Sequence, residues 1–282
     1  MKGIVIGANG MLGCDVMRAG KAAGHQMLGF DLPELDVTNY PDLRSQLPDA
    51  DWLINCSAYT RVDDAEKERD AAFAVNVEGV RNLSRISHRR MLPVFHMSTD
   101  YVFDGCAGRP YREADRVNPL NIYGVSKLAG EKALRGGGGP YTIVRTQSLF
   151  GKHGPNFVKS IARKIRESDE PLRVVEDQVS APTYTAHLAD ALMRLVRVKP
   201  DGIVHVTASG SCSWYEFACA IVQEIKPGHE VLPVSSAEMS RPARRPAFSI
   251  LENRRYTALT GHTMPSWREG LKAALEEEGF LE

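Results

Sequence analysis

Short, uniformly apolar runs alternate with longer amphipathic stretches along most of the chain. Runs of this kind without polar alternation are typical of strands that are covered on both faces, as in a parallel sheet. They occur at Ile4-Val5-Ile6 and at 27–30, 51–58, 92–97, 141–145 and 202–207. Because stretches with helical spacing follow most of them, the pattern predicts an α/β fold with a Rossmann-type, doubly wound parallel sheet.

The amphipathic stretches predict helices, and several carry a polar residue suited to an N-cap. A helix that reaches Leu47 is expected to start at Thr38 or Asn39, and another at Ser213 or Trp214. Further helices are predicted at 14–23, 65–88, 156–167, 186–198 and 271–281. Asn76 lies within the second of these, where a buried amide with satisfied hydrogen bonds is the expected role.

A glycine run at 136–139 marks a loop near a possible domain boundary. The chain has 282 residues, enough for one large domain or two linked ones. We expect residues 1–146 to form a dinucleotide-binding domain and residues 147–282 to form mainly a smaller α/β lobe that binds substrate. Segments near 172–207 are expected to return to the large sheet.

The first strand runs directly into a glycine-rich turn and a helix. The turn is Gly7-Ala8-Asn9-Gly10-Met11-Leu12-Gly13. Glycines here permit a tight turn and close approach of a pyrophosphate, whose charge then rests on backbone amides at a helix N-terminus. Gly7, Asn9, Gly10, Met11, Leu12 and Gly13 are therefore candidate cofactor-binding residues.

Asp31 ends the second strand near the distance along the chain at which an acidic side chain meets the adenosine ribose in such folds. A carboxylate accepts from the ribose 2′-hydroxyl and repels a 2′-phosphate, which favours NAD(H) while leaving NADP(H) possible. The alternative, nearly as well supported, is that Asp31 only begins the loop at 31–34 and does not bind the ribose. Asp36 is a candidate to approach the adenine of the cofactor, and a capping or turn role explains it equally well. Ala58 ends a strand in small residues, which would let a cofactor lie close to the backbone.

A phenol and an amine lie on one face of a further predicted helix. Asn118 is suited to cap it and Pro119 to open it, which places Tyr123 and Lys127 one turn apart. An ammonium beside a phenol lowers the pKa of the phenol, so Tyr123 is a candidate acid. An amphipathic helix that merely carries both residues is the alternative.

Thr99 supplies a third group, because it follows the strand at 92–97. Hydroxyls at the carboxyl end of such a strand face the ligand crevice of a doubly wound sheet. Thr99 is therefore expected to bind a substrate carbonyl while Tyr123 gives it a proton.

Four segments make the chain resemble the dTDP-4-dehydrorhamnose reductase family, within the extended short-chain dehydrogenase/reductase superfamily. They are Ser98-Thr99-Asp100-Tyr101-Val102-Phe103, the stretch 119–131, Asp177-Gln178-Val179-Ser180-Ala181-Pro182-Thr183 and Arg245-Pro246-Ala247-Phe248-Ser249. The resemblance implies Thr99, Tyr123 and Lys127 as the catalytic set, with Tyr123 and Lys127 also contacting cofactor. It implies reduction of the C4 ketone of a nucleotide-linked deoxysugar, and Thr99, Asp100, Tyr101, Gln178 and Arg245 as substrate-binding residues.

Two positions, Ser148 and Asp15, are compared with the residues that members of this family carry there. Ser148 stands where members of the family commonly carry a tryptophan that walls the sugar pocket. Asp15 matches a carboxylate that the family links to metal-bridged dimers, although an acid at a helix N-terminus that stabilises the dipole is the simpler interpretation. A homodimer is possible, and no catalytic metal is expected.

Two other functions stay open. A sugar-nucleotide epimerase or dehydratase would share the fold, but the dehydratases need an acid where this chain has Tyr101. A non-catalytic, dinucleotide-binding subunit is the other alternative, because the family resembles the regulatory β subunit of methionine adenosyltransferase.

Composition narrows the function classes. Lys plus Arg and Asp plus Glu are both 35, so no global positive charge favours nucleic-acid binding. The five cysteines lack zinc or Cys-x-x-Cys spacing, the pattern of reduced thiols in a cytoplasmic protein. No run of about 18 apolar residues and no signal-peptide pattern is found, so we expect no membrane association.

Overall fold

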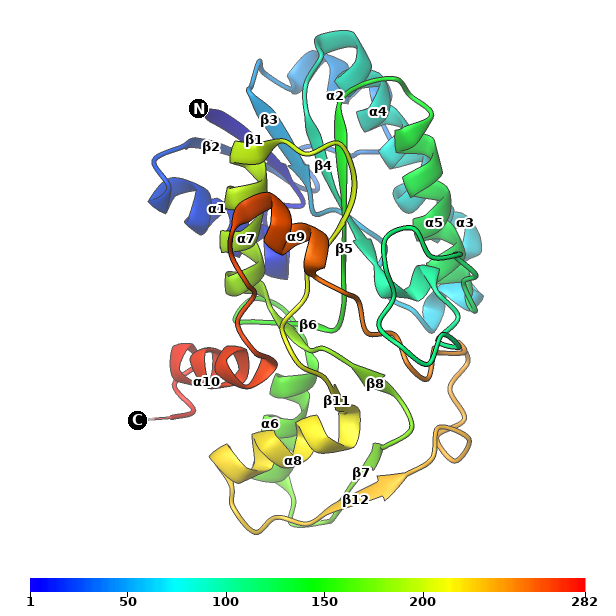
Figure 1. Cartoon of the computed structure of the whole chain (residues 1–282), viewed down its shortest axis with the longest axis vertical. Helices are drawn as coiled ribbons and strands as arrows, with labels where there is room; N and C mark the ends of the chain where they lie inside the picture. The colour runs from blue at the N-terminus through cyan, green and yellow to red at the C-terminus, as the bar shows by residue number, and fades with distance from the viewer. Residues whose placement is uncertain (282) are drawn as a thin grey trace.

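A computed structural model describes residues 1–281 and contains a six-stranded, fully parallel sheet (Figure 1). In spatial order its strands are β10 (Gly202–His205), β5 (Tyr141–Thr146), β4 (Val94–Thr99), β3 (Trp52–Asn55), β1 (Lys2–Ile6) and β2 (Gln26–Phe30). The predicted doubly wound α/β fold is confirmed. Because the strand order reverses beside β1, the crevice for a ligand lies at the carboxyl ends of β1 and β3.

Helices cover both faces of this sheet. Figure 1 shows α1 (Met11–Ala22) and α7 (Thr185–Val198) on one side, and α4 (Val80–Arg90) and α5 (Ile122–Arg135) on the other. Leu12, Val16 and Leu188 pack with the strands in one core, and Leu83 and Leu134 in the second. Burial on both faces explains the apolar runs of the inner strands β1, β3 and β4, whereas the edge strand β2 is partly exposed.

A smaller lobe lies beyond the sheet, and its core is formed by the aromatic residues Phe150, Phe217 and Trp267. Its helices are α6 (Phe157–Glu167), α8 (Trp214–Ile225) and α10 (Trp267–Glu277). Its short strand pairs are β6 (Leu149–Phe150) with β9 (Thr183–Tyr184), β7 (Leu172–Val175) with β12 (Val231–Val234), and β8 (Val179–Ser180) with β11 (Cys212–Ser213). Two further helices are α2 (Tyr40–Gln46) and α9 (Arg254–Thr260).

The segment near 172–207 divides between the two lobes. Helix α7 and strand β10 return to the large sheet as expected. Strand β7 does not, because it pairs in parallel with β12 instead. That part of the expectation is wrong, since the partner strand lies almost sixty residues further along the chain and no local pattern identifies it.

The long helix predicted at 65–88 is broken into four segments. These are a 3₁₀ turn at Asp64–Glu66, α3 (Arg69–Phe73), a π-helical segment at Ala74–Gly79, and α4. Asn76 lies in the π segment, where its amide bonds the backbone N–H and C=O of Tyr59 at 2.9 and 3.1 Å and the Ser126 hydroxyl at 2.9 Å. Asn76 is the satisfied buried amide that was predicted, and its bonds to two other segments accompany the local change in helix geometry.

The start of α5 also differs from the prediction. Its N-cap is Asn121, whose side chain accepts from the N–H of Gly124 at 2.7 Å. Asn118 instead donates its amide to Asp104 at 3.1 Å, so Pro119 lies outside the helix. Elsewhere the predicted caps Asn39 and Ser213 are confirmed. Within residues 1–281, none of the helices has the length and apolar character needed to cross a membrane.

Candidate active site

The glycine turn lies against the carboxyl end of β3. Gly7 has a φ of 77°, and a Cβ there would be 2.7 Å from the backbone nitrogen of Ser57. A Cβ on Gly13 would meet the carbonyl oxygen of Gly7 at 2.0 Å, so that glycine is required for packing between the turn and α1. Gly10 has more space, since its Cβ would lie 3.3 Å from the same oxygen.

A cavity of about 290 Å³ opens beside this turn. Of the candidate cofactor residues, Gly7, Gly10, Asp31, Asp36 and Ala58 line it. The N-terminus of α1 lies at the turn, where its amides and dipole favour an anion. The residues present therefore fit a dinucleotide. Leu12, by contrast, places its side chain in the core, and Met11 begins α1.

Asp31 holds the turn in shape. Its carboxylate accepts from the backbone N–H of Asn9 at 2.9 Å and from that of Leu32 at 2.8 Å. Asp36 accepts from the backbone N–H and hydroxyl of Thr38, both at 2.8 Å. Asp36 thus has the turn role that the sequence left open, while Asp31 stabilises the turn from a position that also faces the cavity.

Thr99, Tyr123 and Lys127 come together beyond this cavity, at the junction of β4 and α5. The Thr99 hydroxyl accepts from the N–H of Tyr101 at 3.1 Å and donates to Asp100 at 3.0 Å. The Lys127 ammonium is buried and donates to the carbonyl of Met97 at 2.7 Å. The ring of Tyr123 contacts that of Tyr101 edge to face at 5.8 Å.

Burial dominates the electrostatics of this group. It raises the pKa of the Tyr123 phenol above its usual range, although the Thr99 hydroxyl opposes the shift. It lowers the pKa of Lys127 to about 8. The expected lowering of the Tyr123 pKa by Lys127 is therefore not met in this structure, because desolvation of the phenol dominates and Lys127 is not among the groups that shift this pKa.

Asp100 and Tyr101 extend the site toward the smaller lobe. Burial raises the pKa of Asp100 to about 6, and its Oδ2 has no hydrogen-bond partner among residues 1–281. Burial also raises the pKa of Tyr101 to about 12, while the guanidinium groups of Arg245 and Arg241 oppose the shift. A buried carboxyl and a phenol thus stand between Tyr123 and a set of arginines.

Those arginines line a second cavity, of about 500 Å³. Arg241, Arg244, Arg245 and the predicted Gln178 contribute to its wall. Asn121, the N-cap of α5, donates to the carbonyl of Arg244 at 2.8 Å, so the arginine segment is attached to the helix that carries Tyr123. Positive charge in a cavity beside a proton donor suits an anionic substrate.

Arg245 is not free within this cavity. Its guanidinium binds Asp63 through two hydrogen bonds and donates to the carbonyl of Ala243 at 2.9 Å. Asp63 also accepts from the N–H of Ala243 at 3.1 Å. Sequence reasoning missed Asp63, because no spacing signal connects residues that lie so far apart along the chain.

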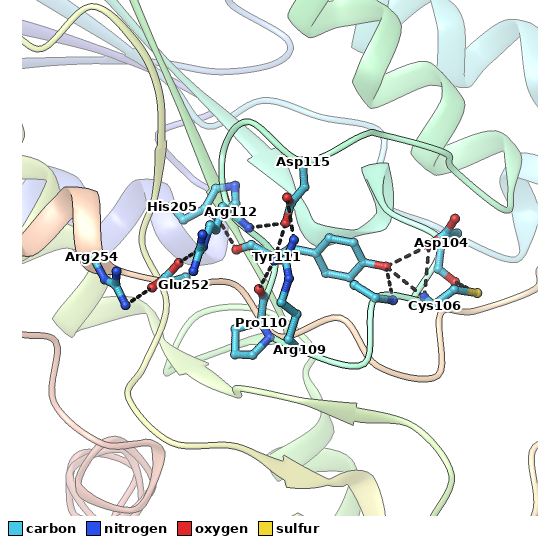
Figure 2. Close-up of polar contacts among 11 residues, drawn as sticks. Asp104, Cys106, Arg109, Pro110, Tyr111, Arg112, Asp115, His205, Glu252 and Arg254 are labelled. Carbon is cyan, nitrogen blue, oxygen red and sulfur yellow. Dashed lines mark hydrogen bonds and ion pairs between the residues drawn. The ribbon is translucent and has the colours of Figure 1, made fainter.

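Asp104, Gly105 and Cys106, at the start of the loop 104–118, also line this cavity, and the loop is fixed by a polar network (Figure 2). The Tyr111 hydroxyl donates to Asp104 at 2.8 Å and accepts from the N–H of Cys106 at 2.9 Å. Arg112 pairs with Glu252 at 2.9 Å, and Tyr111 forms a parallel bridge with Leu251. The loop is thereby joined to the segment that follows the arginines.

Asp15 lies beyond the first turn of α1, which has no acidic residue, so its expected role as an acid at the helix N-terminus is not met. Ser148 has a φ of 48°, and its hydroxyl lies 2.9 Å from that of Ser180. Asp15 is buried and binds Arg18 at 2.8 Å. Within residues 1–281 no group of three or more His, Cys, Asp or Glu side chains has a geometry suited to a metal ion.

Comparison with known proteins identifies the family. A family model described as the RmlD substrate binding domain matches residues 1–279. Spore coat polysaccharide biosynthesis protein SpsK of Bacillus subtilis is 38% identical over 98% of this chain and 97% of the relative. The dTDP-4-dehydrorhamnose reductase of Sinorhizobium fredii is 36% identical over 96% of each. The protein belongs to the dTDP-4-dehydrorhamnose reductase family.

A solved structure supports the same assignment. The dTDP-4-dehydrorhamnose reductase of Bacillus anthracis, in complex with NADP, has 40% sequence identity and a TM-score of 0.94. The match covers 98% of this chain and 99% of that one. The resemblance inferred from the sequence motifs is confirmed, and this family's fold extends over both lobes described above.

Proposed function

We propose that the protein is a NAD(P)H-dependent reductase of the C4 ketone of a nucleotide-linked deoxysugar, with dTDP-4-dehydrorhamnose as substrate and dTDP-L-rhamnose as product. The relatives named above as reductases support this function. Two contacts of the predicted catalytic residues support it. Cys56, which lines the glycine-turn cavity, is close enough to Lys127 for their charges to interact. Tyr101, whose ring contacts that of Tyr123, is close to Arg245 in the wall of the arginine-lined cavity. A hydride donor and an anionic sugar nucleotide would meet at the predicted catalytic residues.

The reduced nicotinamide, when bound, supplies a hydride to the ketone carbon. The backbone amides of the glycine turn hold the pyrophosphate, and Lys127 holds the nicotinamide ribose. Thr99 donates a hydrogen bond to the C4 oxygen. Tyr123 gives that oxygen a proton as the carbonyl becomes an alkoxide, so that a hydroxyl results.

The buried setting of Tyr123 agrees with a role as acid. A phenol whose pKa is raised stays protonated over the physiological range, and it is a donor until negative charge develops on the substrate oxygen. Lys127, with a pKa of about 8, remains largely charged at neutral pH. Its charge would stabilise the phenolate that remains after proton transfer.

The proposal extends to the choice between NADH and NADPH. The Bacillus anthracis relative was crystallised with NADP. In this chain the carboxylate of Asp31 faces the cavity, which favours the 2′-hydroxyl of NADH over the 2′-phosphate of NADPH. We propose that both are used and that NADH is preferred.

The arginine-lined cavity is proposed to bind the nucleotide diphosphate. Arg245, held by Asp63, and its neighbours Arg241 and Arg244 supply permanent positive charge, and Gln178 supplies an amide. Asp100 and Tyr101 lie between this charge and Tyr123, where they are proposed to contact the sugar. The test is turnover of dTDP-4-dehydrorhamnose with either reduced cofactor, measured beside UDP-, GDP- and CDP-linked ketosugars.

A further inference from the structure

A fully buried ion pair joins α5 to β5, directly behind the catalytic group. Glu131 and Arg145 have side chains that are each 2% exposed. The Nε and Nη2 atoms of Arg145 donate to the two carboxylate oxygens of Glu131 at 2.8 and 2.7 Å. The hydroxyl of Ser98 donates to Glu131 Oε1 at 2.6 Å. The carboxylate is therefore held by three donors.

The pair lies one helical turn beyond Lys127. Since Lys127 and Glu131 are four residues apart on α5, they share one face of that helix. Lys127 donates to Met97, and Glu131 accepts from Ser98, which is the next residue of β4. Thr99 follows immediately. The contacts of Lys127 with Met97 and of Glu131 with Ser98 thus fix the register of α5 on β4. They do so at the two strand residues that precede Thr99.

Stability alone does not account for these buried charges. An apolar pair of the same volume is often as stable as a buried ion pair, because removing two charges from water is costly. The Arg145 guanidinium also lies 5.1 Å from the ring of Phe103, which stacks on Tyr111 at 4.1 Å. The network therefore connects the catalytic helix with the loop that lines the substrate cavity.

The groups around Lys127 single out Glu131 as its anionic neighbour. Burial lowers the pKa of Lys127, while Glu131 and the thiol of Cys56 raise it. His96 also lies near Lys127, and burial keeps the pKa of that imidazole well below its usual value, so it is neutral. Tyr123, one turn before Lys127, is a protonated phenol.

We propose that Glu131 is a positioning residue for the reduction, and that its carboxylate, held by Arg145 and Ser98, keeps the Lys127 ammonium charged and in place. The inference rests on the proposed function, because it assigns Lys127 a role in that reaction. Its electrostatic part is independent of turnover. It predicts that loss of the Glu131 charge makes Lys127 lose its proton at lower pH.

The variant for the test replaces both members of the pair, Glu131→Gln with Arg145→Met. Glu131→Gln alone leaves a buried, unpaired guanidinium and is expected to unfold, whereas the double variant leaves no unpaired charge. An NMR titration of the protein with isotope-labelled lysine then gives the pH midpoint at which Lys127 loses its proton. The Lys127 signal is assigned as the one that is missing from the spectrum of Lys127→Met. Glu78→Gln, at an exposed ion pair with Arg81, is the control.

We expect a wild-type midpoint near 8. In the double variant it should fall, because Glu131 raises the pKa of Lys127 whereas Arg145, which is also replaced, is not among the groups that shift it. The high-pH decline of kcat/KM should move by the same amount. An unmoved Lys127 midpoint in the folded double variant overturns the inference, even if activity falls. Absence of turnover in the wild type would refute the proposed function and leave the NMR result to decide this inference.

Discussion

Arg245 and Asp63 form a two-pronged ion pair between the two lobes, with Nη2 to Oδ2 at 2.7 Å and Nη1 to Oδ1 at 3.1 Å. Asp63 lies in the loop after β3, while Arg245 lies in the wall of the arginine-lined cavity. The Arg245 side chain is only 10% exposed. The contact therefore fixes the guanidinium before any substrate arrives.

Arg245→Lys should weaken binding of the nucleotide-sugar. Lysine keeps the charge but loses the planar fork that binds Asp63 and a diphosphate together. Since hydrogen bonds to charged groups contribute about 1.5–3 kcal/mol, KM should rise roughly ten-fold or more, with kcat also reduced if the sugar is less well oriented. Steady-state kinetics at saturating cofactor measure both constants.

Two controls separate this role from a general effect. Arg254→Lys changes an exposed arginine that pairs with Glu252, and it should leave KM unaltered. Asp63→Asn should reproduce part of the Arg245→Lys defect, because it releases the guanidinium. Equal kinetics for wild type and Arg245→Lys would remove Arg245 from the substrate site.

Gly10→Val should block the cofactor without unfolding the chain. Its side chain would enter the cavity beside the turn, and the nearest backbone atom lies 3.3 Å from the new Cβ. Gly13→Val should instead reduce stability, because its Cβ would overlap the Gly7 carbonyl. Cofactor titration and thermal unfolding distinguish these effects, with Gly136→Ala as the control. Undiminished affinity in folded Gly10→Val would argue against the turn as the pyrophosphate site.

Asp31→Ala should change cofactor preference. Removal of the carboxylate eliminates repulsion of a 2′-phosphate, so the ratio of kcat/KM for NADPH to that for NADH should rise. Affinity for both should fall somewhat, because the N–H of Asn9 loses its acceptor. If the ratio stays constant while both affinities fall, Asp31 only shapes the turn.

Acid should weaken the loop 104–118. The Arg109 guanidinium and the N–H of Arg112 lower the pKa of Asp115 from 3.8 to about 2. A carboxyl with a depressed pKa contributes stability above its unfolded pKa, and the contribution is lost as pH falls through the folded value. Asp115→Asn should therefore lower Tm near neutral pH, and the difference from wild type should shrink between pH 3.8 and about 2. A constant difference would exclude this ion pair as the cause.

Local chemistry explains which features the sequence predicted. The inner strands β1, β3 and β4 were predictable because both of their faces are buried. The caps Asn39 and Ser213 were predictable because each acts on an amide within the first turn of its own helix. Asn118 and Asn121 are both able to cap a helix. The choice between them depends on Asp104, which takes the Asn118 amide through a tertiary contact.

The remaining differences arise from long-range contacts and burial. The pairing of Arg245 with Asp63 leaves no periodic trace in the sequence. The pKa of Tyr123 was expected to fall from the spacing to Lys127, but spacing does not reveal that the phenol is desolvated. The positions of Thr99, Tyr123 and Lys127 were predictable because they occupy the end of one strand and one turn of one helix.

The central claim is tested most directly by mixing purified protein with dTDP-4-dehydrorhamnose and NADH or NADPH, with Tyr123→Phe measured alongside. We expect one cofactor oxidised for each C4 hydroxyl formed. We also expect a kcat that is about 10² to 10⁴ lower in Tyr123→Phe, because general acid catalysis contributes that much, with cofactor affinity unchanged. No cofactor oxidation with any nucleotide-linked ketosugar, or wild-type turnover in Tyr123→Phe, would contradict the account.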